Sequence, residues 1–319
     1  MLIGVLTSGG DAPGMNAAVR AVVRTTIFRG CQVIGIRRGL HGLLQNDMVL
    51  LDTSSVADII YRGGTILYTG RSEEFRTPEG QKRALDILRD NAIDGLLLVG
   101  GDGTVRAAQV IDDAGIPANC IPGTIDNDIP YSDTSIGFDT AVNTICDAVD
   151  KVRDTAEALE RTFIVEVMGR SSGFLALTSG VACGAESIIV PEFGIDYERV
   201  CQRLRNSVAR RKRHSIIILA EGAGDAPTVS AEIRRRTGYD LRVITLGHIQ
   251  RGGTPTAQDR VLASTLGYHA VELLVQGTHG KLVGQENGRI SVVDLGAAAS
   301  SKKPLNKESF EMAEVLSAT

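Results

Sequence analysis

Two carboxylates, Asp126 and Asp128, are separated by a single residue and follow a short apolar run at residues 118–121. The run predicts the end of a buried strand, and Pro122 and Gly123 would turn the backbone outward after it. Carboxylates this close repel each other unless a cation or a proton lies between them, so the pair indicates a ligand-binding or catalytic loop. The alternative is an Asx-rich turn whose side chains bond only their own backbone.

Two glycine-rich loops have the composition of phosphate-binding loops. Residues 7–11 lie between an apolar run and a stretch with helical spacing, and residues 100–104 have the same setting. Glycines let the backbone approach a ligand closely, and a helix N-terminus offers N–H groups and positive potential to a phosphate. Asp102 adds a carboxylate of the kind that Mg²⁺ takes together with phosphate oxygens and water. Each loop could also be a plain turn between a strand and a helix.

Basic residues follow or flank several predicted strands. They are Arg71, Arg161, Arg170, Arg242, His248 and Arg251. A single arginine is usually a solvated surface residue, but arginines at glycine-rich strand ends are well placed for bidentate phosphate recognition. Glu221, at the end of another predicted strand, either accepts hydrogen bonds from sugar hydroxyls or is a solvated charge. Together these residues indicate a second, phosphate-bearing substrate.

The segments that must position these residues alternate between strands and helices. Strands are predicted at residues 2–6, 32–36, 95–99, 118–121, 163–167, 187–190, 215–220 and 241–246. Helices are predicted at residues 15–28, 56–61, 81–89, 140–158, 173–182, 197–210, 230–237 and 257–275, from the second glycine loop to about 114, and short segments lie near 282 and 290. This alternation predicts an α/β fold with mostly parallel sheets covered on both faces.

The bulk properties limit the class of protein. A chain of 319 residues predicts two domains, and 43% hydrophobic residues with a mean hydropathy of +0.04 are ordinary for a soluble protein. The net charge of -4 argues against a nucleic-acid partner. Five widely spaced cysteines predict reduced, buried thiols, and no window has the apolar length of a membrane span. We expect a cytoplasmic protein without a membrane partner.

With these motifs the chain closely resembles the bacterial ATP-dependent 6-phosphofructokinases. The anchors are residues 6–16, 100–104, 122–128, 166–170 and 247–253. The resemblance implies two similar doubly wound, mostly parallel-sheet domains, each built from separate segments. Residues 1–137 and 251–300 would bind the nucleotide, and residues 138–250 and 301–319 the sugar phosphate. The absence of a linker-like stretch agrees with such an exchange of segments.

The resemblance also implies a role for each candidate residue. ATP would be held by Gly10, Arg71, Ser72, Gly101, Asp102, Gly103 and Thr104, with Asp102 on Mg²⁺. Asp126 would be the general base for the sugar 1-hydroxyl, in a catalytic set with Thr124, Asp128 and Arg170. Fructose 6-phosphate would be held by Thr124, Asp126, Met168, Gly169, Arg170 and Glu221, and its 6-phosphate by Arg161, Arg242, His248 and Arg251. In this family Arg161 and Arg242 reach a neighbouring subunit's site, which implies a homotetramer.

Two glycines bear on the phosphoryl donor. Pyrophosphate-dependent relatives resemble this pattern but have Asp in place of Gly103 and Lys in place of Gly123, so glycine at both positions predicts ATP. Alternatives remain open: pyrophosphate as donor, tagatose 6-phosphate or sedoheptulose 7-phosphate as side substrates, or a non-catalytic nucleotide sensor on the same fold. A sensor would be expected to have lost Asp102, Asp126 or Asp128, and all three are present.

A regulatory site is implied as well, because members of the family bind ADP or phosphoenolpyruvate between subunits. The matching residues are Arg20, Arg24, Arg153, Glu186, Arg210, Lys212 and His214. Thr53 stands where well-studied members have Arg, and Arg210 replaces a Lys. We therefore expect a retained but retuned effector site, the alternative being a solvated basic face.

Overall fold

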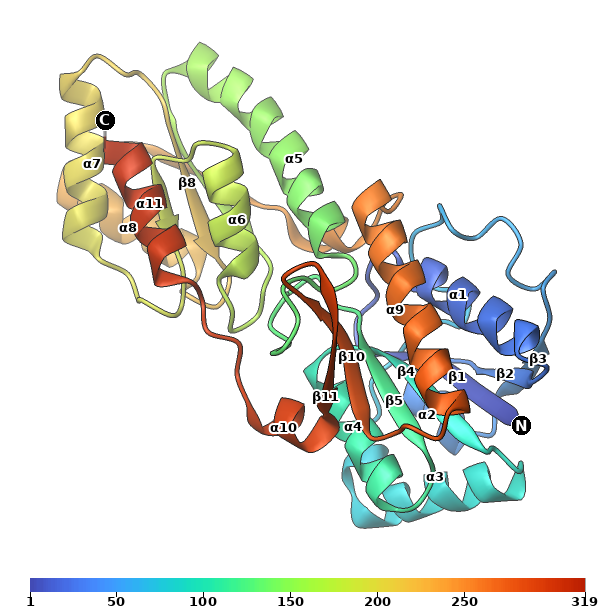
Figure 1. Ribbon diagram of the computed structural model, residues 1–319. Coiled ribbons are helices and arrows are strands. Elements are labelled where there is room, and N and C mark those ends of the chain that lie inside the picture. Colours follow the sequence, from blue (N-terminus) through green and yellow to red (C-terminus); the bar gives the residue numbers. More distant parts are fainter. Residues whose placement is uncertain (319) are drawn as a thin grey trace. The chain divides into compact units, whose positions relative to one another are not determined.

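The computed structural model describes residues 1–318 as two compact units. The first comprises Met1–Thr140 and Arg251–Lys303, and the second comprises Ala141–Gln250 and the segment from Pro304 onward. The chain therefore passes from one unit to the other three times. Each unit has its own sheet, and each is described here by itself (Figure 1).

The first unit contains a seven-stranded sheet in the order β11-β10-β5-β4-β1-β2-β3. Its strands are β1 (Leu2–Ser8), β2 (Gln32–Ile36), β3 (Met48–Leu51), β4 (Gly95–Gly100), β5 (Ala118–Pro122), β10 (Lys281–Glu286) and β11 (Arg289–Asp294). The five inner strands are parallel, and β3 and β11 pair antiparallel at the two edges. Every residue of β4 is buried, which explains why its sequence is an uninterrupted apolar run.

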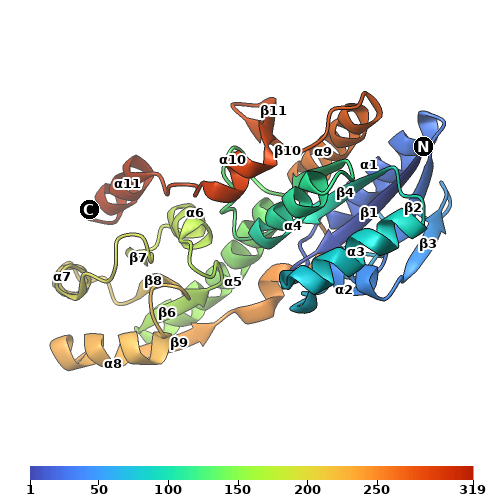
Figure 2. The ribbon, with the colours of Figure 1, turned by 90° about the horizontal axis from the view of Figure 1, so that it is seen from below.

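Helices cover both faces of this sheet. They are α1 (Met15–Phe28), α2 (Gly39–Leu44), α3 (Pro78–Asp90), α4 (Asp102–Asp113), α9 (Ala257–Val275) and α10 (Leu295–Ser300), with the short 3-10 helix η1 (Glu74–Arg76). Leu96 and Leu98 belong to one core cluster with apolar side chains of α2, α3, α4 and α10. Figure 2 shows α2, α3 and α4 on the same face of the sheet. Gly95 meets Leu274 of α9, and α9 lies alongside α1 (Figure 1). The alternation of side chains along β4 thus divides the core into two layers.

The second unit contains a four-stranded, fully parallel sheet in the order β7-β8-β6-β9. Its strands are β6 (Thr162–Val167), β7 (Ser187–Ile189), β8 (Ser215–Ala220) and β9 (Leu241–Thr245). Its helices are α6 (Phe174–Ala182), α7 (Tyr197–Ala209), α8 (Ala226–Thr237) and α11 (Lys307–Ala318), together with most of α5 (Phe138–Leu159). Apolar side chains of α7 and α8 cluster with Ile164, Ile217 and Leu219 on one face of the sheet, and α11 packs against α6 and β7.

The α/β fold with mostly parallel sheets is confirmed, and most predicted elements are present with bounds shifted by a few residues. The predicted helix at 56–61 is wrong, because this stretch consists of turns. The Asp52 carboxylate accepts hydrogen bonds from Ser54 and Ser55 just before it, and Asp58 has a φ of 52°. Side chains that bond the local backbone in this way compete with helix formation.

Two other expectations need qualification. All five cysteines are free, but only Cys120 and Cys201 are buried. Strand β5 continues through Pro122, which pairs with Gly100, instead of ending at Ile121. Within residues 1–318 no helix combines the length and the apolar character that a membrane-spanning helix needs.

A buried carboxylate fixes the start of α5 in the first unit. Asp259, on the first turn of α9, is fully buried and accepts hydrogen bonds from the backbone N–H groups of Gly137 and Thr140, both at 2.8 Å, and from the Thr140 hydroxyl. Burial raises the pKa of the Asp259 carboxyl, although these hydrogen bonds act in the opposite direction. The carboxylate therefore supplies acceptors for donors that α5 itself cannot satisfy.

We predict that Asp259→Ala destabilises the protein by roughly 3 kcal/mol, because it leaves several buried donors without an acceptor. Denaturant unfolding followed by circular dichroism measures this effect. Asp86→Ala is the matched control, since Asp86 is exposed on α3 and should cost less than about 0.5 kcal/mol. Equal midpoints for the two variants would contradict the structural role of Asp259.

Candidate active site

Three loops of the first unit meet at one edge of its sheet. Strand β1 has β2 on one side and β4 on the other, and ligands bind to open α/β sheets at such a change of direction. The register pairs Ser8 with Gly100 and Gly100 with Pro122, so β1, β4 and β5 end side by side. The loops that follow them are the two glycine-rich loops and the loop with the paired carboxylates.

The loop after β4 leads directly into helix α4. Gly101 is the N-cap residue, and Asp102 and Gly103 lie in the first helical turn. A Cβ atom at Gly103 would meet nothing within 4 Å, so this side of the loop is open. The Thr104 hydroxyl donates to the Ser8 carbonyl at 3.4 Å, which connects the loops after β1 and β4. The start of α4 thus presents its N–H groups and positive dipole to open space.

Asp102 has the exposure and the surroundings that a metal ligand needs. Its side chain is 44% exposed, and its carboxylate forms an ion pair with Arg106 one helical turn later, at 3.0 Å. In the described part of the chain no group of three or more His, Cys, Asp or Glu residues could hold a metal ion. The single carboxylate at this helix start therefore fits a Mg²⁺ ion that takes most of its ligands from phosphate and water.

The loop after β5 is buried and firmly held. Thr124 and Asp126 are 8% and 3% exposed. The Thr124 hydroxyl accepts the N–H of Asp126 at 3.2 Å, and the Ser135 hydroxyl donates to the Thr124 carbonyl at 2.6 Å. Asn127, between the two carboxylates, has a left-handed φ of 53° and accepts the N–H of Ser135 at 3.0 Å. These contacts hold Asp126 in one place at the strand end.

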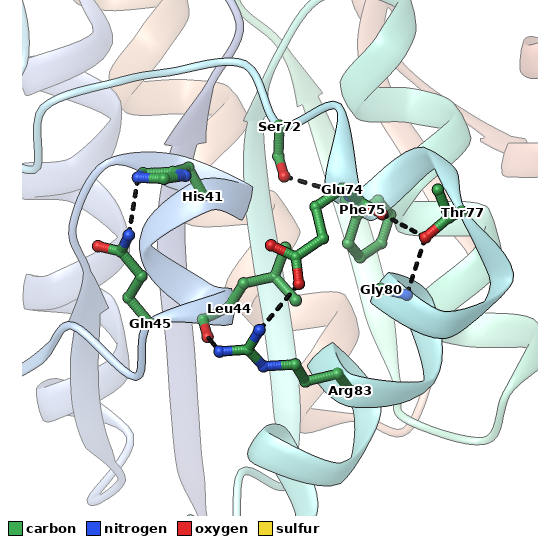
Figure 3. A network of polar contacts seen from close by, with 9 residues as sticks. All are labelled: His41, Leu44, Gln45, Ser72, Glu74, Phe75, Thr77, Gly80 and Arg83. Carbon is green, nitrogen blue, oxygen red and sulfur yellow. Dashed lines mark hydrogen bonds and ion pairs between the residues drawn. The ribbon is translucent and has the colours of Figure 1, made fainter.

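A further loop brings Arg71 and Ser72 toward the loop after β1. The Gly9 carbonyl accepts from the Thr69 hydroxyl at 3.0 Å, and the N–H of Gly9 donates to the Gly70 carbonyl. The Ser72 hydroxyl accepts the N–H of Phe75 at the start of η1 (Figure 3). Arg71 itself is exposed.

The same loop is braced by α2 and α3 (Figure 3). Arg83 donates to Glu74 at 2.8 Å and to the Leu44 carbonyl at the end of α2 at 2.9 Å. Thr77 accepts the N–H of Gly80 and so caps α3, while His41 and Gln45 bond each other along α2. The segment after Arg71 and Ser72 is therefore held at Glu74 by the Arg83 side chain of α3, which also bonds the end of α2.

Arg251 lies in the first unit, against the loop after β1. It donates to the Asp11 carbonyl at 3.1 Å, and a Cβ atom at Gly10 would overlap its guanidinium group. A larger residue at position 10 would therefore have to displace the Arg251 guanidinium group. The sequence predicted a role for Arg251 at the sugar 6-phosphate, whereas in this structure its guanidinium contacts the predicted nucleotide loop.

In the second unit, three neighbouring strands present candidate sugar-binding residues at their carboxyl ends. Met168, Gly169 and Arg170 follow β6, Glu221 follows β8, and His248 follows β9. Glu221 accepts the N–H of Arg170 at 2.7 Å, so these loops are in direct contact. Gly169 and Arg170 have φ values of 135° and 53°, a sharp turn that glycine permits at the first position.

Gln250 is a residue of this site that the sequence analysis did not single out. Its side chain is fully buried, accepts the N–H of Met168 at 3.1 Å and donates to the Gly247 carbonyl at 2.9 Å. It therefore ties the loop after β6 to the short 3-10 helix η2 (Gly247–Arg251) that carries His248. A glutamine in the motif at 247–253 gave no other signal of this role.

Arg161 and Arg242 lie at the opposite end of the same sheet. Arg161 directly precedes β6, and Arg242 pairs with Phe163 near the start of β9. The six residues of β6 separate these arginines from Arg170 by about 20 Å. The unit therefore does not bring them together with Arg170 and His248.

The candidate effector residues fall into two groups. Arg20 and Arg24 lie on α1 in the first unit. In the second unit Glu186 is buried, forms an ion pair with Lys212 and accepts the N–H of Ile216 at 2.5 Å. Arg153 of α5 donates to the carbonyl of Cys183, which precedes Glu186 by three residues. Arg210 and His214 flank Lys212 in the sequence. In the second group, Lys212 thus contacts the buried Glu186 carboxylate, and Arg153 is bonded three residues before it in the chain.

Glycine loops at adjacent parallel strand ends, a carboxylate at a helix start and a buried carboxylate beside it are the features of an enzyme that transfers phosphoryl groups. Residues 2–274 match the family model for phosphofructokinase, and the chain belongs to this family. The resemblance inferred from the sequence is confirmed.

Named relatives match over nearly the whole chain. The ATP-dependent 6-phosphofructokinase of Clostridioides difficile is 55% identical over 315 residues, and that of Halothermothrix orenii is 52% identical over 328 residues, with 99% of both chains covered in each case. Among solved structures, phosphofructokinase from Saccharomyces cerevisiae is 34% identical with a TM-score of 0.86, covering 99% of this chain and 48% of that one.

Proposed function

We propose that the chain transfers the terminal phosphoryl group of ATP to the 1-hydroxyl of fructose 6-phosphate, the glycolytic reaction of an ATP-dependent 6-phosphofructokinase. The observation that carries the proposal is the buried Asp126 in the loop after β5, next to β4, whose glycine-rich loop leads into the open start of α4. Relatives that are more than half identical over nearly their full length bear that enzyme's name. A cytoplasmic location would follow from a role in glycolysis.

In this proposal the first unit binds the nucleotide and provides the base. Gly10, Gly101, Gly103, Thr104, Arg71 and Ser72 line the ATP phosphates, and Asp102 holds Mg²⁺, which neutralises phosphate charge when bound. Asp126 accepts the proton of the sugar hydroxyl as the bond to phosphorus forms, and a carboxylate of ordinary pKa suffices for this. The Thr124 hydroxyl orients Asp126 by accepting the N–H of Asp126, and Asp128 is the second carboxylate of the loop.

The second unit binds the sugar phosphate. Met168, Gly169 and Glu221 contact the sugar, His248 binds the 6-phosphate, and Arg170 screens the transferring group. Arg251, which belongs to the first unit, is proposed as a second ligand of the 6-phosphate. Because Arg161 and Arg242 lie about 20 Å away at the other end of the sheet, they serve the site of a second copy of the chain. A homotetramer, as in the family, provides such copies.

The donor is ATP rather than pyrophosphate in this proposal. Gly103 faces open space at the start of α4, where an aspartate would place a negative charge and fill the room that the α-phosphate needs. A Cβ atom at Gly123 would lie 2.8 Å from the Val99 side chain, so a larger residue there would require that side chain to move.

A coupled assay of the purified protein with fructose 6-phosphate tests the donor. We expect turnover with ATP and none with pyrophosphate, and a fall in ATP turnover of at least about 10²-fold in Gly103→Asp. Gly103→Ala is the matched control and should fold and retain most ATP activity, because its methyl group meets open space. Unchanged ATP kinetics in Gly103→Asp would refute the steric argument, and preference for pyrophosphate would refute the donor.

The second prediction concerns the base. Asp126→Ser should lower kcat by about 10²- to 10⁴-fold and leave the affinities for both substrates nearly unchanged, because the proton acceptor acts in the transition state. Calorimetric titration measures the affinities, and single-turnover kinetics measures the chemical step. If the wild type is active and the variant has the same kcat, Asp126 is not the base. If both proteins are inactive, the result favours a non-catalytic binding protein.

We propose further that the basic residues around Glu186 form a retained but retuned effector site for ADP or phosphoenolpyruvate. The ion pair of Glu186 with Lys212 and the nearby Arg153 support a pocket of mixed charge. Thr53 is exposed in the loop after β3 and supplies no cation, so phosphate capture is weaker than with an arginine there.

At sub-saturating fructose 6-phosphate, initial rates should change with added phosphoenolpyruvate or ADP. Thr53→Arg should shift the response to lower effector concentrations, because the added guanidinium binds phosphate, and Thr53→Gln is its uncharged control. Rates that stay flat for both effectors in the wild type and in Thr53→Arg would exclude the site.

A further inference from the structure

Lys303 connects the C-terminal part of the first unit to the loop with the paired carboxylates. It is the last residue of that unit and follows α10 by a few residues. Its ammonium group donates to the side-chain oxygen of Asn127 at 3.0 Å and to the backbone carbonyl of Asp133 at 2.9 Å. Asn127 is the residue between Asp126 and Asp128, so the ammonium group acts at the centre of the candidate catalytic loop.

The contacts of Lys303 close a small ring of hydrogen bonds. The side-chain N–H of Asn127 also donates to the Asp133 carbonyl, at 3.2 Å, while its oxygen accepts from Ser135. The Asp133 segment is in turn held by strand β10 and the turn after it, because its N–H donates to the Gln285 carbonyl at 2.7 Å and its carboxylate accepts from Asn287. Lys303 therefore bridges Asn127, which has a left-handed φ, and the backbone at Asp133, which is hydrogen-bonded to β10.

The charge of this ammonium group is sensitive to pH near neutrality. Burial lowers the pKa of Lys303 to about 8, and the nearby carboxylates of Asp133 and Asp128, the charged groups that face it, oppose the shift. Below about pH 8 the group is an ammonium ion with three donors, and above that pH it loses one donor and its positive charge.

We propose that Lys303 is a positioning residue for phosphoryl transfer, whose ammonium group holds the Asp126–Asp128 loop in its reactive conformation. The inference rests on the proposed function. Loss of the proton turns the charge-assisted hydrogen bond to Asn127 into a weaker neutral one, and removal of the group abolishes it. A small displacement of the adjacent Asp126 is enough to reduce turnover, since reacting groups must be held within a fraction of an ångström. The effect is on kcat rather than on the KM for ATP.

The test measures kcat and both KM values from about pH 6.5 to pH 9.5 by direct detection of ADP. Four proteins are compared: wild type, Lys303→Arg, Lys303→Met and the control Lys302→Met, in which the neighbouring exposed lysine is changed. We expect wild type and Lys302→Met to lose kcat as the pH rises above about 8, because Lys303 then loses its proton. Lys303→Arg should not lose kcat there, because arginine stays charged.

Lys303→Met should have a kcat at least about tenfold below wild type at pH 7, without the alkaline loss, and an ATP KM close to that of the control. Thermal unfolding shows whether Lys303→Met is folded. If it is not, the proposal is tested by whether kcat of Lys303→Arg still falls above about pH 8. Equal kcat profiles for Lys303→Met and Lys302→Met would overturn the proposal, as would an unchanged alkaline limb in Lys303→Arg. An inactive wild type would instead overturn the proposed function.

Discussion

The parallel register of β1, β4 and β5 is the constraint on which the candidate site depends. Pairing of Ser8 with Gly100 and of Gly100 with Pro122 makes these strands end at one level, and adjacent strands lie about 4.8 Å apart. The loops after them must therefore share one edge of the sheet. A slip of one residue would exchange the side chains on the two faces of β4 and would bring a larger side chain to the place of Gly95, against Leu274 of α9.

The chain leaves or enters the first unit at three points, and a side chain near each point is bonded within that unit. Thr140 is held by Asp259, Arg251 donates to the Asp11 carbonyl, and Lys303 donates to Asn127. Two of these contacts reach candidate ligand loops directly. The third lies a few residues after Ser135, which itself holds the candidate catalytic loop. The candidate ligand loops of the first unit are therefore hydrogen-bonded to, or close to, the segments where the chain enters and leaves that unit.

Strongly patterned elements could be predicted from the sequence, and elements formed by distant contacts could not. The bounds of α1, β2, β8 and α9 agree with the prediction because their apolar patterns are long or bounded by clear breaks. Helix α2 contains two glycines in six residues, which hid it. Gln250 and Lys303 gave no signal, because their partners lie 82 and 176 residues away in the chain.

The geometry of the second sheet bears on how many chains a complete sugar-phosphate site requires. Side chains at the two ends of a parallel strand cannot contact one small ligand, so Arg161 and Arg242 have no place beside His248 within one unit. Within the described residues the one salt bridge of Arg242 is to Asp240 at 3.5 Å, and a half-exposed pair of this kind contributes little to stability. Under the proposed function, phosphate recognition in another copy of the chain would give both arginines a function that folding alone does not, and the site would depend on assembly.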